Sequence, residues 1–399
     1  MNRVFITAAT ASAPSGTDVN EIFENVREAK SSLGKIEHFD ASEFPVSHGA
    51  EVRHEQQVVK TPSGTDRKSF FIEKAVDELI EKIDINRYQP AKRHIHMGAG
   101  IDFFDIENYV NSGKASTGAW QPFCSHSNNV IDRLVRKHQL KGGHSTNVAA
   151  CAASTQSIGL GFRIVRNDPA DMVITGGYDS MLCHLHYLGF YKLGALSDWQ
   201  GDPAKACRPF DKKRCGLVLG EGAVSYLLES QANADKDSIL AEICGYSSTM
   251  DSYLVTDPDP EGTYLAKAAM QAIAEADIGP EDIDSVHLHG TGTYKNALAE
   301  AKAMKIIFKD RARDIPVYSM KGQIGHLIGA CGAMELLAAI WSLKNSMVPV
   351  TVNFEEADPE VELNVIKDKP VKLNIKYILK LNAAFGGQNT ALVLRRHDE

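Results

Sequence analysis

Apolar and amphipathic segments alternate along the whole chain. Residues 3–7, 94–97 and 172–175 are short apolar-rich runs typical of strands, and the last two of them lead directly into glycines. Residues 69–83 instead repeat apolar side chains at the spacing of one helix face, with Lys and Glu between them. This alternation predicts an α/β protein.

Several of these features occur twice, in the same order. One helix rich in Ala and Gly begins near Cys151 and another near Cys331, and a Met-Val pair that predicts a strand follows each of them. These two Met-Val pairs lie at residues 172–173 and 347–348. Strands bounded by glycine repeat as well, at residues 94–98 and 287–290 and at residues 215–220 and 384–387.

This repetition predicts two similar α/β halves, residues 1–238 and residues 239–399. The small side chains on both Ala- and Gly-rich helices predict that these helices pack closely in the middle of the molecule. The period is far too long for a solenoid of short repeats.

The composition is that of an ordinary globular protein, with 399 residues of which 43% are hydrophobic and 24% charged. The formal net charge is −8, and no long basic tract is present, so we expect no nucleic-acid partner. No apolar run approaches the ~18 residues of a transmembrane helix. Residues 1–14 also lack the basic and apolar regions of a secretory signal, so we expect no membrane span.

The seven cysteines are scattered and never form a Cys-x-x-Cys pair. An odd number without such spacing disfavours a disulfide framework or a structural zinc site. We therefore expect a reduced, cytoplasmic environment, in which most of these cysteines are small buried hydrophobic residues.

Cys151 is a candidate nucleophile. A strand is predicted to lead into a helix at this residue, and a thiol at a helix N-terminus lies at the positive end of the helix dipole, which favours the thiolate. The alternative is a buried structural cysteine, since free cysteines are among the most buried residues.

His289 lies at the end of a predicted strand, and the sequence Gly-Thr-Gly-Thr after it suits a tight turn beside a ligand. Strand alternation points His287 and His289 to the same face. A core histidine bonded to a backbone carbonyl is the alternative. A metal site is disfavoured, because no third cluster of ligands accompanies the His-x-His pair.

His326 precedes the second Ala- and Gly-rich helix, so we expect it to hold the position that Cys151 holds in the first half. Lys321 and Glu335 flank it. A lysine and a glutamate around a histidine more often belong to a solvent-exposed face, but the glycines around these residues indicate a tight, buried turn. Phe385 begins a Phe-Gly-Gly turn after a predicted strand, and such a turn can offer a backbone N–H to an oxyanion. A plain hairpin turn is the alternative there.

Four of these motifs occur in a fixed order: Ala-Cys-Ala-Ala-Ser at Cys151, His-Gly-Thr-Gly-Thr at His289, Lys-x-x-x-x-His-x-x-Gly-Ala from Lys321, and Phe-Gly-Gly-x-Asn at Phe385. Together they resemble the β-ketoacyl-acyl-carrier-protein synthases, over nearly the whole chain. The resemblance implies the thiolase fold, in which two duplicated halves form a five-layered αβαβα sandwich. It also implies a dimer in which the sheets of both subunits are continuous.

The resemblance further implies a two-step condensation without a metal or organic cofactor. Cys151 would accept an acyl group, with its own N–H and that of Phe385 binding the oxyanion. His289 and His326 would donate hydrogen bonds to malonyl-acyl-carrier protein as it loses CO₂. Lys321 would act on the field around His326, and Glu335 would pair with Lys321.

The same resemblance implies an acyl-carrier protein as partner, with Arg67 and Lys68 as its docking residues. Departures from the family pattern, such as Cys215 and the Ala383-Ala384 pair, favour a specialised type II polyketide or aryl polyene pathway over housekeeping fatty acid synthesis. The enzyme would be a homodimer or a heterodimer with a chain-length-factor-like homologue.

Three other functions are considered. A non-catalytic chain-length-factor subunit usually lacks the nucleophile, whereas Cys151 is present here. A thiolase would carry a second catalytic cysteine near the C-terminus, and the Phe-Gly-Gly motif has none. A cysteine hydrolase also uses Cys and His, but no protease motif is present.

Overall fold

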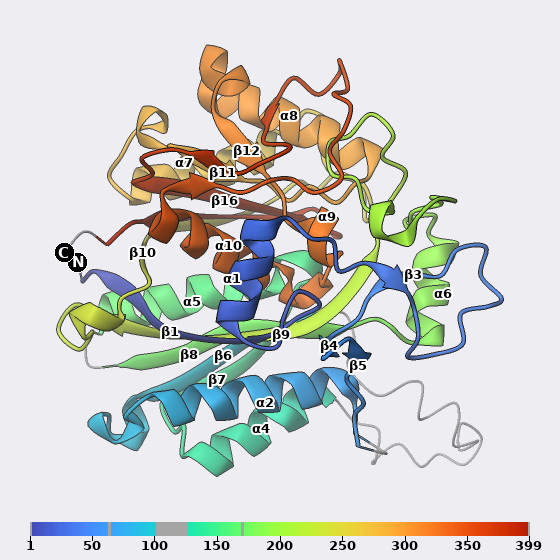
Figure 1. The fold of residues 1–399 in the computed structure, drawn as a ribbon. Helices are drawn as coiled ribbons and strands as arrows, with labels where there is room; N and C mark the ends of the chain where they lie inside the picture. The colour runs from blue at the N-terminus through green and yellow to red at the C-terminus, as the bar shows by residue number, and fades with distance from the viewer. Residues whose placement is uncertain (1, 63–64, 101–125, 169–170, 398–399) are drawn as a thin grey trace.

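The computed structural model describes residues 2–62, 65–100, 126–168 and 171–397. Its layers are visible from top to bottom in Figure 1: helices, sheet, helices, sheet, helices. Helices α7 (Thr263–Glu275) and α8 (Tyr294–Phe308) cover one outer face, and α2 (Arg67–Lys82) and α4 (His126–His138) cover the other. Helices α5 (Ala153–Asn167) and α10 (Cys331–Asn345) lie between the two sheet layers. The five-layered αβαβα arrangement implied by the resemblance is therefore confirmed.

The sheet layers are two parts of one 13-stranded sheet that meet where β1 pairs with β10. Two of its strands are short and lie off the main order: β3 (His48–Ala50) pairs with β9, and β2 (Gly34–Lys35) pairs with β3. In spatial order, the strands of the first half are β1 (Val4–Ser12), β9 (Leu219–Ser230), β8 (Met172–Ser180), β6 (Arg93–Ala99) and β7 (Gly143–Val148). Those of the second half are β10 (Ala241–Met250), β17 (Gln388–Arg395), β16 (Tyr377–Ala384), β11 (Ser285–His287), β12 (Pro316–Tyr318) and β14 (Asn364–Val365).

Both halves use the same strand order and the same directions. The first two pairings of each half are antiparallel and the next two are parallel. The repeat read from the glycine-bounded strands is thus confirmed, with β6 matching β11 and β9 matching β17. The predicted boundary between residues 238 and 239 falls in the connection from β9 to β10.

One part of the predicted repeat is wrong. Met347 and Val348 form β13, which pairs with β15 (Val371–Lys372) in a separate two-stranded sheet. The counterpart of β8 is instead β16, which begins at Tyr377. The second half has a long connection between its central helix and this strand, so the same dipeptide occupies a different place.

The main helices are α1 (Val19–Glu28), α2 (Arg67–Lys82), α4 (His126–His138), α5 (Ala153–Asn167), α6 (His184–Lys192), α7 (Thr263–Glu275), α8 (Tyr294–Phe308), α9 (Lys321–Ile324) and α10 (Cys331–Asn345). The helix predicted over residues 69–83 is confirmed as α2, and it starts earlier because Asp66 caps it. Within the described ranges, no helix has both the length and the apolar character that a bilayer crossing requires.

Apolar side chains fill each interface between layers. One cluster lies between α2, α4 and the first sheet layer, and it includes Phe71 and Leu134. A second lies between α7, α8 and the other layer, and the largest surrounds α5 and α10. Burial of these three clusters from water is the main source of stability for the stacked layers.

Small residues let the central helices approach each other. A Cβ atom added at Gly332 on α10 would overlap the hydroxyls of Thr155 and Ser154 on α5. The backbone N–H of Ala333 also donates to the Ser154 hydroxyl across this contact, at 3.0 Å. The predicted close packing of the two helices is confirmed.

We predict that Gly332→Ala lowers the free energy of unfolding by about 1–3 kcal/mol, because overpacking forces helices apart. Chemical denaturation followed by circular dichroism measures this change. Gly189→Ala on α6 is the matched control, since nothing lies within 4 Å of its added Cβ. That control should be neutral or stabilising by up to ~1 kcal/mol; equal losses in both variants would contradict the packing argument.

Candidate active site

Cys151 lies in a single 3₁₀ turn, Ala150–Ala152, between β7 and α5. Ala150 has a φ of 46°, a left-handed conformation that alanine rarely adopts. No side chain caps the start of α5; instead the backbone N–H groups of Ala152 and Ala153 donate to the backbone oxygens of Ala149 and Ala150 in the preceding turn. The predicted strand-to-helix context of Cys151 is confirmed.

The second half repeats this turn at Ile328–Ala330, just before α10, and Ile328 has a φ of 44°. The counterpart of Cys151 is therefore Gly329. The expectation that His326 holds the equivalent position is wrong, since His326 lies three residues earlier in the chain and before the turn.

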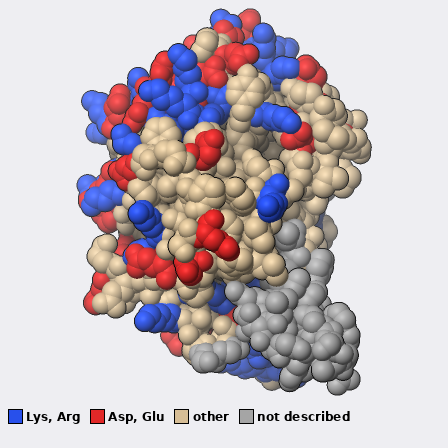
Figure 2. Space-filling view, turned by 90° about the vertical axis from the view of Figure 1, so that its right-hand side faces the viewer, with Lys and Arg blue, Asp and Glu red and all other residues tan. Residues whose placement is uncertain are grey.

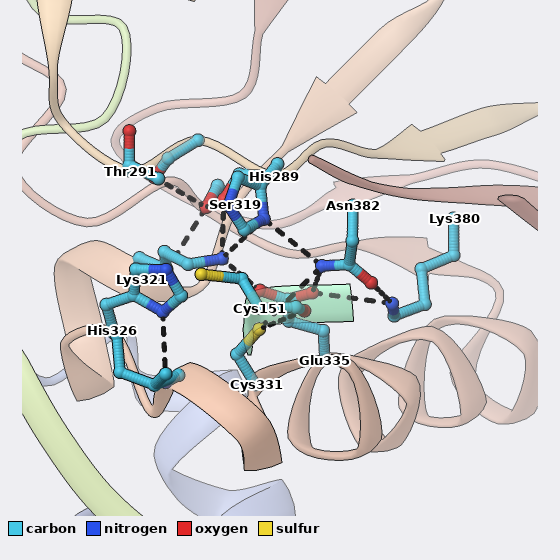
Figure 3. A network of polar contacts seen from close by, with 12 residues as sticks. Cys151, His289, Thr291, Ser319, Lys321, His326, Cys331, Glu335, Lys380 and Asn382 are labelled. Carbon is cyan, nitrogen blue, oxygen red and sulfur yellow. Dashed lines mark hydrogen bonds and ion pairs between the residues drawn. The ribbon is translucent and has the colours of Figure 1, made fainter. Parts of the chain in front are cut away.

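The structure nevertheless brings Cys151, His289 and His326 together (Figure 3). One side-chain nitrogen of each histidine and the thiol sulfur all lie within 4.8 Å of one another. The two imidazole rings are 5.2 Å apart and nearly perpendicular. All three side chains are buried and line one cavity of about 290 Å³.

The hydrogen bonds fix the tautomer of both histidines. Nδ1 of His326 accepts from the backbone N–H of Ile328 at 3.2 Å. Nδ1 of His289 lies 3.1 Å from the Asn382 amide nitrogen and 3.2 Å from the Lys321 ammonium, which are both donors. A neutral imidazole that accepts at Nδ1 carries its proton on Nε2.

Burial, and then the charge of Lys321, lower the pKa of His289 and His326 well below the usual histidine value. Both rings are therefore neutral near pH 7, with Nε2–H left for the cavity. A protonated nitrogen cannot ligate a metal ion. The cluster of one thiol and two imidazoles is thus arranged to donate hydrogen bonds and not to bind a cation.

The predicted pairing of Lys321 with Glu335 is present, and both side chains are fully buried. The Lys321 ammonium also donates to the backbone oxygen of His289 at 2.6 Å. Its direct contact is therefore with His289, whereas the sequence suggested His326. Burial alone would raise the pKa of Glu335, but the ammonium groups of Lys321 and Lys380 lower it to about 2.

Cys151 is only 4% exposed, and burial raises the pKa of its thiol to about 12. The nearby Lys321 charge and a hydrogen bond from the Phe385 backbone oppose this effect without cancelling it. The thiolate expected from the helix dipole is therefore not the resting form. Phe385 lies where the sequence placed it, in the turn after β16, with its N–H at the thiol.

Two residues of this site have no short motif and were not predicted. Lys380 and Asn382 are completely buried on β16, where the sequence shows only a strand. Alternation along that strand places both on one face. A lysine and an asparagine at alternating positions of an otherwise apolar strand are the signal that could have identified them, because buried polar groups need partners.

Arg67 and Lys68 lie apart from this cluster, at the start of α2. Arg67 is 6% exposed and its Nε donates to Glu221 at 2.5 Å, while Lys68 is 1% exposed. Neither side chain offers a charge at the surface, so the docking role predicted for this pair is corrected. Figure 2 shows where Lys and Arg gather instead on one face of the molecule, toward the α7 and α8 side.

Comparison with known proteins gives consistent matches over the whole chain. Residues 1–234 match the family described as "Beta-ketoacyl synthase, N-terminal domain", and residues 240–355 match its C-terminal domain. The 3-oxoacyl-[acyl-carrier-protein] synthase 2 of Staphylococcus aureus (strain COL) is 32% identical over 409 residues, which is 99% of each chain.

Two solved structures share the fold over their full length. One is a type II PKS acyl-carrier protein in complex with its ketosynthase, with a TM-score of 0.87 and 24% identity. The other is the ishigamide ketosynthase/chain length factor, with a TM-score of 0.85 and 24% identity. Each alignment covers 100% of both chains.

We predict that Cys151 reacts slowly with iodoacetamide at neutral pH. Because its pKa is raised to about 12, the thiolate fraction and the rate should rise about tenfold per pH unit from about pH 7 to about pH 10. Peptide mass spectrometry measures the adduct at Cys151. The Cys151→Ala variant, which cannot form this adduct, confirms which peptide carries it. A rate that reaches a plateau near pH 7 would show a preformed thiolate and contradict this reading of the site.

Proposed function

The chain belongs to the β-ketoacyl synthase family, and from this we propose that it is a 3-oxoacyl-acyl-carrier-protein synthase. It lengthens an acyl chain held on Cys151 by decarboxylative condensation with malonyl-acyl-carrier protein. The observation that carries this assignment is the convergence of one thiol and two Nε2–H donors, from His289 and His326, in one buried cavity.

In the first step the Cys151 sulfur attacks the thioester carbonyl of an acyl-carrier protein. A new carbon–sulfur bond forms and the bond from the carbonyl carbon to the carrier sulfur breaks. The proton of the Cys151 thiol leaves with the carrier thiol, and the acyl group remains on Cys151. Negative charge develops on the carbonyl oxygen in between. The backbone N–H groups of Cys151 and Phe385 stabilise that oxygen, since the Phe385 N–H already lies at the sulfur.

In the second step the malonyl thioester occupies the cavity with its carbonyl oxygen against His289 and His326. The bond to the carboxylate breaks, CO₂ leaves, and its electron pair forms an enolate. Two neutral imidazoles stabilise this oxygen as fixed donors and need no proton transfer of their own. The enolate carbon then attacks the acyl carbonyl, the Cys151 sulfur leaves, and a 3-oxoacyl product remains on the carrier protein.

The non-catalytic chain-length-factor alternative is not favoured. Such a subunit would have no use for a buried nucleophile, whereas Cys151 here lies at a strained turn with an uncapped helix behind it. The two side chains that donate to Nδ1 of His289, those of Lys321 and Asn382, are also present. The site therefore has what the condensation requires from the protein.

The partners proposed are an acyl-carrier protein and a second ketosynthase-like subunit. Both kinds of complex occur among the solved structures that share this fold. Strand β7 supports a dimer, because within the described residues it pairs only with β6 and its other edge remains open to a further strand. The second subunit is an identical chain or a chain-length-factor-like homologue. The enzyme works in the cytoplasm, in fatty acid, type II polyketide or aryl polyene synthesis.

We predict that Cys151→Ala abolishes both covalent acylation and condensation. Intact mass spectrometry after incubation with acyl-carrier proteins detects the acyl group, and its mass identifies the substrate. Cys151→Gln resembles the acylated side chain in shape, so it should still decarboxylate malonyl-acyl-carrier protein. Acylation that persists in Cys151→Ala would assign the nucleophile to another thiol, such as Cys331.

We predict that His289→Ala and His326→Ala each lose decarboxylation by about 10²–10³-fold, the usual effect of removing one oxyanion donor. Transfer of the acyl group to Cys151 should be retained in part, since that step uses backbone donors. Release of ¹⁴CO₂ from labelled malonyl-carrier protein measures the first reaction. Wild-type decarboxylation in either variant would remove that histidine from the mechanism.

A further inference from the structure

Lys380 and Asn382 form a buried polar network behind His289 that the proposed reaction does not yet use. Both project from β16 toward the helices α5 and α10 (Figure 3). Neither is among the residues that line the cavity. They are fully buried, with contacts to Thr155, Glu335 and His289. Burying an ammonium and an amide between two sheet layers is costly, so such a network needs a physical reason.

The contacts of Asn382 fix the orientation of its amide. Its oxygen accepts from the Lys380 ammonium and from the Thr155 hydroxyl, the latter at 2.7 Å. Its nitrogen donates to Glu335 Oε2 at 2.6 Å and faces Nδ1 of His289 at 3.1 Å. A flipped amide would place its oxygen against the carboxylate and its NH₂ against the ammonium, so only one orientation satisfies all four partners.

This orientation acts directly on His289. Because the amide nitrogen can only donate, Nδ1 of His289 must accept, and the ring proton must stay on Nε2 at the cavity. Lys321 also reaches Nδ1, at 3.2 Å, but its ammonium is shared with Glu335 and the His289 backbone oxygen. Asn382 is therefore the second donor that holds the tautomer.

Lys380 also contacts the carboxylate of this network. Its Nζ lies 3.4 Å from Glu335 Oε2, while Lys321 pairs with the other oxygen of the same carboxylate. Lys321 and Lys380 thus face the two oxygens of one carboxylate, while a second buried carboxylate, that of Glu300, accepts from the backbone N–H of His289. The contact of Lys380 that bears on His289 is the one with the Asn382 oxygen, because it holds the amide in the orientation that faces the imidazole.

We infer that Asn382, held in one orientation by Lys380, is a positioning residue that keeps the His289 Nε2–H directed at the enolate oxygen. This inference rests on the proposed condensation. The inference assigns Lys380 and Asn382, from a strand that carries no short motif, a role in the decarboxylation step. It assigns them no role in loading Cys151, because neither residue contacts the cavity.

The test compares the two half-reactions in Asn382→Leu, which keeps the volume but removes the amide, and Lys380→Met, which keeps the length but removes the charge. Decarboxylation of malonyl-carrier protein should fall at least ~10-fold in each, below the ~10²–10³-fold loss of a direct donor. Acylation of Cys151 should stay within about threefold of wild type. Equal loss of both half-reactions, or no loss of either, would overturn the inference.

Ser342→Ala is the matched control. It removes another buried polar group from α10, whose partners are the Tyr318 hydroxyl and the Ala338 backbone oxygen, outside this network. Both half-reactions should remain at wild-type rates in this variant. A selective loss of decarboxylation in Ser342→Ala would mean that any buried polar deletion has this effect, and the inference would then fail.

A measurement on the wild-type enzyme avoids dependence on how the variants fold. Nitrogen-15 NMR of histidine-labelled enzyme, with the His289 signals assigned from His289→Gln, should show the neutral Nε2–H tautomer. An Nδ1–H tautomer or an imidazolium at neutral pH would overturn the inference. Failure of the proposed function is a separate outcome, in which wild-type enzyme does not decarboxylate malonyl-carrier protein at all.

Discussion

The contact between α5 and α10 is the constraint on which the rest of the structure depends. Because Gly332 on α10 has no side chain, hydroxyls of α5 occupy the space that a Cβ atom would need, and the two helix axes approach closely. The turns that precede these helices then meet, and the Cys331 thiol donates to the Cys151 backbone oxygen at 3.1 Å. A nucleophile from one half and hydrogen-bond donors from the other can share one cavity only because of this approach.

Burial of charge follows from the same geometry. Residues that point between the sheet layers have no access to water, so Lys321, Glu335 and Lys380 must satisfy one another. The same lack of water lowers the pKa of both catalytic-site histidines and raises that of the Cys151 thiol. Hydrogen-bond donors fixed by such buried partners need no reorganisation when charge develops beside them, which suits the enolate of the proposed condensation.

Much of the fold was predictable because glycine-bounded strands and Ala- and Gly-rich helices are local patterns. The candidate site residues Cys151, His289 and His326 were predicted from short motifs, and the structure brings them together. Asn382 and Lys380 were not, since they act through partners far away in sequence. The error at Arg67 has a similar cause: a basic pair at a helix start is usually exposed, and its burial depends on Glu221, 154 residues away.

The duplication also explains why a cysteine occupies this turn in only one of the two halves. Ala150 and Ile328 share the same left-handed backbone, so the two turns are built alike, and the residue after each is Cys151 or Gly329. A Cβ atom at Gly329 would overlap the backbone of Ala99 and Gly100 at the end of β6. No side chain fits there, so the second half can contribute to the cavity only from residues on either side of the turn. His326, three residues before Gly329, is one of these residues. The packing at Gly329 therefore explains why the first half contributes a thiol to the cavity and the second half an imidazole.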